Sequence, residues 1–210
     1  MKIYSQQKKI LIIKFGGLGD IILSLDAIFS IKEYHKAQIF LLTEKPYKQF
    51  FIKSKWFKKI ITIKRSFFYF MDINQIKKQI KFGDFDFVYD LQTSKRTSFY
   101  LKFFHNEKVI TNGIGKYAKI EHDDPMRDMM HTFERQRDQI LLSNIKHKLS
   151  LELPWLFQSS FLVPKKKFAL VVPGGSKKRR NKRIPFEVYK QIIIFLLRYN
   201  FKVLIIGTVE

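Results

Sequence analysis

The sequence feature that most constrains the fold is the segment 9–29, KILIIKFGGLGDIILSLDAIF. Its continuous apolar run, residues 10–13, is typical of a strand that is buried on both faces of a parallel sheet. Closely spaced glycines follow, and apolar residues then return at helical spacing, which together predict a strand, a tight loop and a helix. Glycine allows positive φ and close approach of a ligand, so we expect Gly16, Gly17 and Gly19 to line a site.

An acidic residue, Asp20, follows this glycine loop directly. Open α/β sheets bind ligands beyond the carboxyl ends of their strands, so we expect Asp20 to face the working crevice. The alternative is that Asp20 only caps the helix, because Asp is a preferred N-cap residue. The dinucleotide fingerprint G-x-G-x-x-G lacks its third glycine here, and a carboxylate would repel a pyrophosphate, so a dehydrogenase is disfavoured.

Composition narrows the class of protein. The chain has 210 residues, 46% of them hydrophobic, which suits one large domain or one and a half small ones. It has no cysteine, which excludes disulfides and thiolate metal sites and is compatible with the cytoplasm. The net charge of +22 predicts attraction to nucleic acid, an acidic membrane or phosphorylated substrates, although A/T-rich codon usage would also enrich Lys, Ile and Phe. Charges interrupt the apolar stretches, so we expect no transmembrane helix.

The first 150 residues alternate strand and helix patterns, which predicts a parallel sheet with helices on both faces. Strands are expected at 10–13, 38–42, 59–63, 86–91 and 108–111, and helices at 46–52, 72–82 (capped by Asp72), 97–104 and 131–142. The segment 116–130 shows no period and is expected to be a long loop. Its His122 lies among Glu121, Asp123 and Asp124, which we interpret as solvated loop charges, so no metal site is expected.

A second pattern begins after the segment 154–164, which starts and ends with proline and which we interpret as a linker. It comprises a strand at 168–172, a glycine loop at 173–176, a basic run at 177–183, a helix from Pro185 and a strand at 202–206. Two strands and one helix are too few for an independent domain. We therefore expect this part to be incomplete or to dock on the first.

Four segments, in order, resemble glycosyltransferase family 9, the ADP-heptose:lipopolysaccharide heptosyltransferases. They are 10–28 with its Gly19-Asp20 pair, 85–100 (FDFVYDLQTSKRTSFY), 131–140 (HTFERQRDQI) and the region from 168 (FALVVPGGSKKRRNKRIPFEVY) to VLIIGTVE. The resemblance implies a GT-B-like α/β fold: a Rossmann-like acceptor-side domain (1–153), a linker (154–166) and the first part of a second Rossmann-like, nucleotide-sugar-binding domain (167–210). Asp26 stands where the family usually has Pro, Ile184 where it has Trp, and the family's later Asp-x-Gly-x-x-His segment is absent.

The resemblance also implies a function: inverting, metal-independent transfer of a heptose from ADP-heptose, or a similar nucleotide sugar, to a lipid-linked saccharide acceptor, without a cofactor. Asp20 would remove the proton of the attacking hydroxyl. Lys182 would stabilise charge on the leaving phosphate. By their place in the family pattern, the residues expected to bind the donor are Gly174, Gly175, Ser176 and Glu210.

On the acceptor side, the resemblance points to the glycine loop together with Lys95, Arg96, His131 and Arg135. The positive charge further predicts peripheral contact with an anionic membrane, at the cytoplasmic face of the inner membrane. Two alternatives stay open. The chain is an inactive fragment or remnant of such an enzyme, or it is a basic nucleic-acid-binding protein. The second would use the aromatic run 67–70 as a stacking platform, but those residues have apolar neighbours and suit a core or an interface better.

Overall fold

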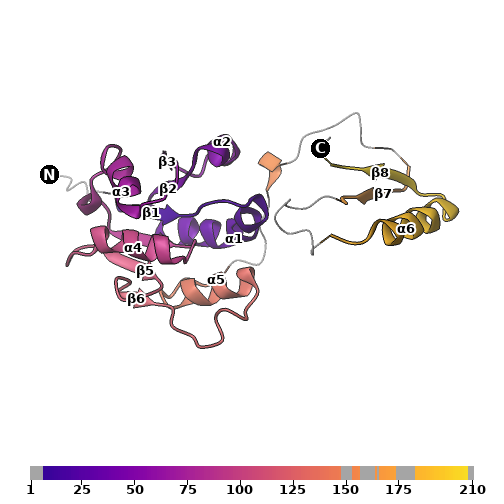
Figure 1. The fold of residues 1–210 in the computed structure, drawn as a ribbon. Helices are drawn as coiled ribbons and strands as arrows, with labels where there is room; N and C mark the ends of the chain where they lie inside the picture. The colour runs from indigo at the N-terminus through magenta and orange to yellow at the C-terminus, as the bar shows by residue number, and fades with distance from the viewer. Residues whose placement is uncertain (1–6, 148–152, 157–163, 165, 174–182, 208–210) are drawn as a thin grey trace. The chain divides into compact units, whose positions relative to one another are not determined.

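The computed structural model describes residues 7–147, 153–156, 164, 166–173 and 183–207 (Figure 1). The chain divides into two compact units, Met1–Phe157 and Gln158–Glu210, and each is described by itself.

Unit 1 is built on a six-stranded parallel sheet in the order β3-β2-β1-β4-β5-β6. The strands are β1 (Lys9–Ile13), β2 (Gln38–Glu44), β3 (Lys59–Ile63), β4 (Phe87–Asp90), β5 (Ile110–Gly113) and β6 (Ile120–Glu121). Because every pair is parallel, all six strands end at the same edge of the sheet, here named the carboxyl edge. The predicted parallel α/β sheet is confirmed, and its strand order reverses direction between β1 and β4, where such sheets bind ligands.

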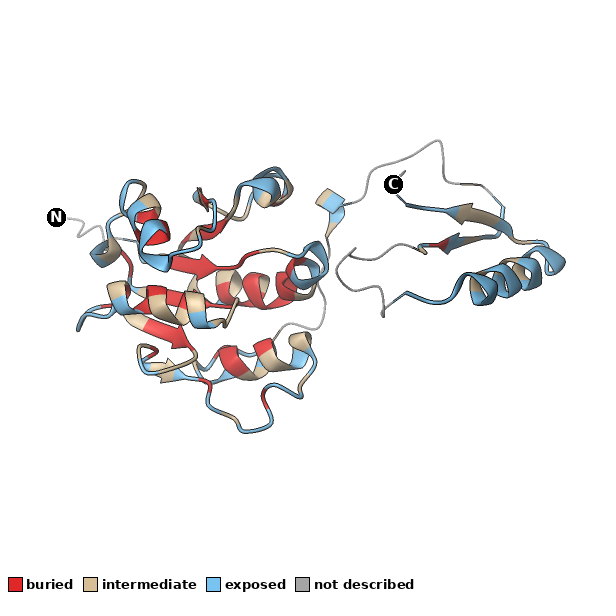
Figure 2. Ribbon diagram, viewed as in Figure 1, coloured by how far each residue is buried: buried red, intermediate tan, exposed pale blue. Residues whose placement is uncertain are grey.

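Helices cover both faces of this sheet because each central strand is apolar on both sides. Ile10 and Ile12 belong to one core with α1 (Leu18–His35), α2 (Lys48–Ser54) and α5 (Thr132–Leu141). Leu11 and Ile13 belong to the opposite core with α3 (Tyr69–Lys77) and α4 (Lys95–Phe104). The central strands are accordingly buried, as Figure 2 shows in red. Short 3₁₀ turns, η1 (Lys45–Tyr47), η2 (Phe82–Asp84) and η3 (Pro154–Leu156), complete the unit.

Two local expectations were wrong. The segment 116–130 is not loop throughout, because β6 adds a short strand beside β5. Asp72 does not cap α3: the helix begins at Tyr69, with Phe68 as its N-cap residue. The carboxylate of Asp72 is instead fully buried and accepts a hydrogen bond from the Ser66 backbone N–H (2.8 Å).

Unit 2 contains a parallel pair of strands, β7 (Phe168–Val171) and β8 (Lys202–Ile205), and the helix α6 (Phe186–Arg198). This order confirms the predicted strand, helix and strand, although Pro185 is the N-cap residue of α6 and not part of its first turn. No residue of α6 is buried, and in Figure 2 the helix is pale blue and tan, without red. In the parts of the chain that the structure describes, no helix has the length and apolar character needed to cross a bilayer.

Candidate active site

The glycine loop joins the end of β1 to α1 at the carboxyl edge. Gly17 is the N-cap residue of α1, and its cap makes no side-chain hydrogen bond. Asp20 is therefore the third residue of the helix, and its side chain is exposed to solvent. The alternative in which Asp20 serves as the N-cap residue is thus wrong. Asp20 lies at the positive end of the helix dipole, on the side of the sheet where ligands of such folds bind.

Contacts from neighbouring strands hold this loop in place. The backbone N–H of Phe15 donates to the side-chain oxygen of Gln92 (3.1 Å), and that of Gly16 donates to the carboxylate of Glu44 (2.9 Å). The expectation of positive φ is wrong for this loop, because Gly115 alone among the described glycines has it. Gly16 is favoured for a different reason: a Cβ there would lie 2.5 Å from the Tyr47 side chain, so that ring would have to move.

A buried lysine, Lys14, directly follows β1 and lies within electrostatic reach of Asp20. Its side chain is 3% exposed, and its Nζ donates to the backbone carbonyl of Leu91 (3.4 Å). Burial lowers the pKa of Lys14 to about 8, against the opposing attraction of Asp20 and Asp90. Lys14 is therefore still a cation at neutral pH, and it lies within electrostatic reach of both carboxylates.

The second carboxylate, Asp90, ends β4 and is fully buried. Its Oδ1 accepts hydrogen bonds from the backbone N–H groups of Gln92 and Thr93, both at 3.0 Å. Its Oδ2 has no hydrogen-bond partner among the described residues. Burial raises the pKa of Asp90 to about 6, against the opposing effects of these hydrogen bonds and of Lys14. Thr93 adopts a left-handed conformation (φ 47°), which is uncommon for a β-branched residue and marks a tightly constrained turn.

Helix α5 is fastened to this edge by two buried glutamines. Gln136 donates to the Ser24 hydroxyl and to the Leu91 carbonyl, both at 3.0 Å. Gln139 donates to the carbonyl of Asp90 (2.9 Å). These bonds fasten α5 to α1 and to the end of β4.

The predicted residues at the start of α5 have different surroundings. Arg135 is half-buried, and its charge contributes to the lowered pKa of both Lys14 and Arg127, so it lies within reach of the site. His131 is exposed and is the N-cap residue of α5, where its Nδ1 accepts from the backbone N–H of Phe133 (3.4 Å).

A buried histidine that the sequence did not identify as a site residue supports the same region. His122 is 3% exposed; the Nε of Arg127 donates to its Nδ1 (3.1 Å), and its Nε2 lies 3.0 Å from the carboxylate of Asp138. Because a guanidinium can only donate, Nδ1 accepts, and Nε2 donates to Asp138. Within the described ranges, no three His, Asp or Glu side chains are grouped so as to hold a metal ion.

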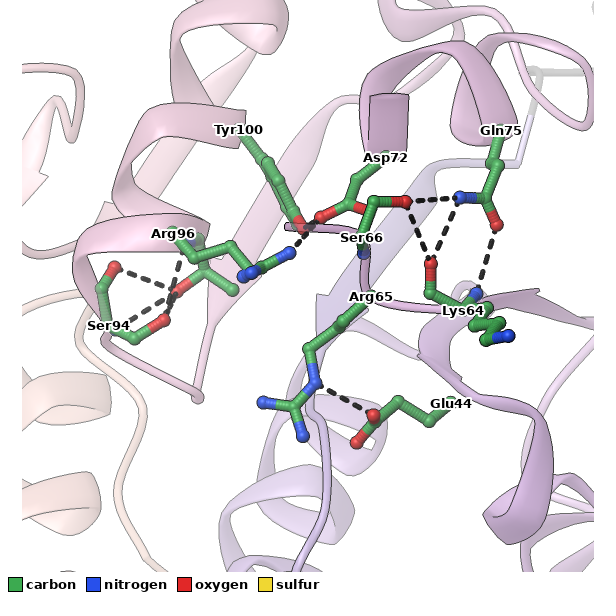
Figure 3. A network of polar contacts seen from close by, with 10 residues as sticks. Glu44, Lys64, Arg65, Ser66, Asp72, Gln75, Ser94, Arg96 and Tyr100 are labelled. Carbon is green, nitrogen blue, oxygen red and sulfur yellow. Dashed lines mark hydrogen bonds and ion pairs between the residues drawn. The ribbon is translucent and has the colours of Figure 1, made fainter. Parts of the chain in front are cut away.

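The other predicted acceptor-side residues follow β4. Lys95 begins α4 and is exposed. Arg96 forms an ion pair with the buried Asp72, which also accepts from the Tyr100 hydroxyl (Figure 3). The guanidinium of Arg96 lies 4.4 Å from the ring centroid of Tyr69. Arg96 is thus already engaged within unit 1.

The carboxyl edge therefore brings together Gly16, Gly17, Gly19, Asp20, Lys95, Arg96, His131 and Arg135, and it adds Lys14 and Asp90. The expected donor-side residues Gly174, Gly175, Ser176, Lys182 and Glu210 lie outside the described residues. An exposed carboxylate next to a buried cation can accept a proton from a bound hydroxyl group.

No protein-family model and no curated protein matches this sequence. Solved structures do match. The glycosyl transferase family 9 protein of Veillonella parvula DSM 2008 has a TM-score of 0.65 at 17% identity, over 96% of this chain and 63% of its own.

Two further structures match over the same share of this chain. E. coli ADP-heptose lps heptosyltransferase II has a TM-score of 0.63 at 13% identity, with 65% of its chain covered. E. coli heptosyltransferase WaaC with ADP has a TM-score of 0.57 at 15% identity, with 67% covered.

The chain thus spans less than two thirds of the length of the Veillonella protein. The expected resemblance to glycosyltransferase family 9 is confirmed in the fold, which is the GT-B-like α/β fold of these proteins.

Proposed function

We propose that this chain is a glycosyltransferase that moves a heptose, or a similar sugar, from an ADP-sugar to a lipid-linked saccharide of the lipopolysaccharide-core type, with inversion and without a metal. One observation carries the proposal. The fold shared with heptosyltransferases presents an exposed acid, Asp20, at the carboxyl edge beside the buried cation Lys14.

In the proposed reaction, Asp20 accepts the proton of an acceptor hydroxyl as that oxygen attacks the anomeric carbon of the sugar. The new carbon–oxygen bond forms as the bond to the ADP phosphate breaks on the opposite face, which inverts the configuration. The leaving phosphate gains negative charge, and we assign its stabilisation to Lys182 and to the backbone N–H groups of the 174–176 loop. Glu210 would contact the nucleoside.

The buried charges near the site would keep Asp20 in place. Lys14 attracts Asp20, and Asp90 balances the positive charge of Lys14 within the protein. Because Lys14 is buried and bonded to the Leu91 carbonyl, its charge is fixed in position before substrate arrives.

On the acceptor side, Lys95 and Arg135 are the cations proposed to contact an anionic acceptor, because among the described residues neither has a buried ion pair like that of Arg96. His131 would act mainly by fixing the start of α5. We place the reaction in the cytoplasm, at the cytoplasmic face of the inner membrane, where a lipid-linked acceptor would be presented.

Calorimetric titration of the full chain with ADP and with ADP-heptose, without added metal, tests the donor assignment. We expect binding, and a loss of about tenfold or more on Lys182→Ala, because a hydrogen bond to a charged group contributes about 1.5–3 kcal/mol. Lys190→Ala, an exposed cation of α6, is the matched control and should bind as the unaltered chain does. No binding by the unaltered chain would contradict the proposal and would favour an inactive remnant of such an enzyme.

A further inference from the structure

An exposed apolar segment follows β3. It consists of residues Phe67, Phe68, Tyr69, Phe70 and Met71, here named the aromatic loop, of which Tyr69, Phe70 and Met71 form the first turn of α3. Phe67 is 87% exposed and Phe70 is 58% exposed, so of the two expected settings, core or interface, these rings do not lie in the core. The rings associate with one another: Phe68 lies 5.7 Å from Phe70 in a stacked arrangement and 5.0 Å from Phe67 edge to face. A continuous apolar patch of this kind marks a contact surface.

The base of the aromatic loop is firmly anchored, as Figure 3 shows. The side chain of Gln75 accepts from the Lys64 backbone N–H and donates to the Lys64 carbonyl, both at 3.0 Å. The Ser66 backbone N–H donates to Asp72 (2.8 Å), whose carboxylate is buried with Arg96. Because two helical side chains fix the residues just before the loop, the rings are held in solvent by the fold.

The charged residues around the aromatic loop are almost all cations. Between residues 45 and 83 the one acidic residue is Asp72, and its charge is neutralised by Arg96. The cations of the same stretch are Lys45, Lys48, Lys53, Lys55, Lys58, Lys59, Lys64, Arg65, Lys77, Lys78 and Lys81. This part of unit 1 is therefore complementary to an anionic surface.

Several of these cations lie at the same edge as the aromatic loop. Lys45 follows β2 and Lys64 follows β3; both are exposed at the carboxyl edge. β3 lies two strands from β1, so the loop is about 10 Å along the sheet from the glycine loop. Glu44 connects the two loops, since it accepts from Gly16 (2.9 Å) and from Arg65 (2.7 Å).

We propose that the aromatic loop docks this chain on an anionic lipid bilayer. The rings of Phe67, Phe68 and Phe70 enter the boundary between headgroups and acyl chains, and Lys45 and Lys64 contact the lipid phosphates. Aromatic and apolar side chains ringed by lysines suit this interface, because burial of the rings and attraction to the anionic lipids act together. The inference does not depend on the proposed transferase activity.

Flotation of the full chain with vesicles tests the docking. We expect binding to phosphatidylcholine vesicles that contain phosphatidylglycerol, and not to vesicles of phosphatidylcholine alone. Phe67→Ser/Phe68→Ser/Phe70→Ser should weaken partitioning by about tenfold or more, because each substitution removes apolar area that the bilayer would bury. Met126→Ser/Met129→Ser, two residues 60% and 81% exposed in another loop, is the control and should partition normally.

Charge reversal distinguishes a specific contribution of the cations at the carboxyl edge from the general effect of the protein's positive charge. Lys45→Glu/Lys64→Glu should weaken partitioning several-fold, whereas Lys77→Glu/Lys78→Glu, at the far end of α3, should weaken it less. Equal loss from both pairs would contradict a defined docking surface.

Phe68→Trp gives a second readout that requires no loss of binding. The emission that this residue adds to that of Trp56 and Trp155 should be quenched by bromine-labelled acyl chains, whereas the emission added by Tyr34→Trp, an exposed site on α1, should not. Equal partitioning of the triple serine variant, or equal quenching at both positions, would overturn the proposal. So would a triple variant that lost only self-association or only oligonucleotide binding.

Discussion

Asp72 is the polar centre that joins α3, α4 and the base of the aromatic loop, so Asp72→Ala should strongly destabilise unit 1. The carboxylate is fully buried and accepts from three donors: the Ser66 backbone N–H, the Arg96 guanidinium and the Tyr100 hydroxyl. Truncation leaves Tyr100, which is itself fully buried, with a hydroxyl that has lost this acceptor.

The expected loss is about 3 kcal/mol in the free energy of unfolding. Breaking a buried ion pair costs about 3–5 kcal/mol, and the low end applies because the Arg96 side chain is 19% exposed and can reach water. The stranded Tyr100 hydroxyl contributes about 1–3 kcal/mol of this. In Asp72→Ala/Tyr100→Phe that part should disappear, so the double variant should be more stable than the sum of the two single losses predicts.

Urea unfolding followed by tryptophan fluorescence measures this directly. The two tryptophans, Trp56 and Trp155, both belong to unit 1, so the signal reports on that unit. The midpoint should fall with an unchanged slope. A loss below about 1 kcal/mol, or strict additivity in the double variant, would refute the assignment of Asp72 as a buried anchor.

Two further predictions concern the candidate site. Gly16→Ala should destabilise unit 1 by about 1–3 kcal/mol, because the added Cβ would displace the Tyr47 ring. Gly19→Ala, where a Cβ would meet no atom within 4 Å, should be neutral or stabilising. Equal urea midpoints for the two variants would contradict this. The pKa of Asp90 in the folded chain, about 6, lies above its ordinary value of 3.8, so protonation stabilises the fold and that stability is lost as pH rises from about 4 to about 6. Asp90→Asn should therefore be more stable than the unaltered chain at pH 7 and similar at pH 4; a pH-independent difference in unfolding free energy would argue against the buried charge.

The local pattern of apolar residues was sufficient to predict most strands of the sheet. The run 59–63 forms β3 over the same residues, because an apolar, β-branched run between turn residues has few other stable arrangements. The helix predicted at 131–142 became α5 with one residue fewer at each end, because His131 caps it. Asp72 was misassigned because a local rule for helix caps cannot detect a partner such as Arg96, which lies 24 residues away.

The site itself depends on contacts that local pattern does not contain. Lys14 and Asp90 each end a buried apolar run, a signal that would have identified both as candidates. Their proximity follows from the register in which Ile13 pairs with Asp90 across β1 and β4, and the sequence alone does not specify that register. The buried contact of Asp26 with His147 likewise joins residues far apart in the sequence. Asp26 stands where glycosyltransferase family 9 usually has Pro.

The most direct test of the central claim is the rate of sugar transfer from ADP-heptose to a lipopolysaccharide-core acceptor by Asp20→Asn, measured beside calorimetric binding of ADP. If Asp20 is the general base, transfer should fall by about 10²–10⁴-fold while ADP binding is unchanged, because Asn keeps the shape of Asp but cannot accept the proton. Transfer at the rate of the unaltered chain would contradict the account and would leave Asp20 as an exposed acid of the first turn of α1.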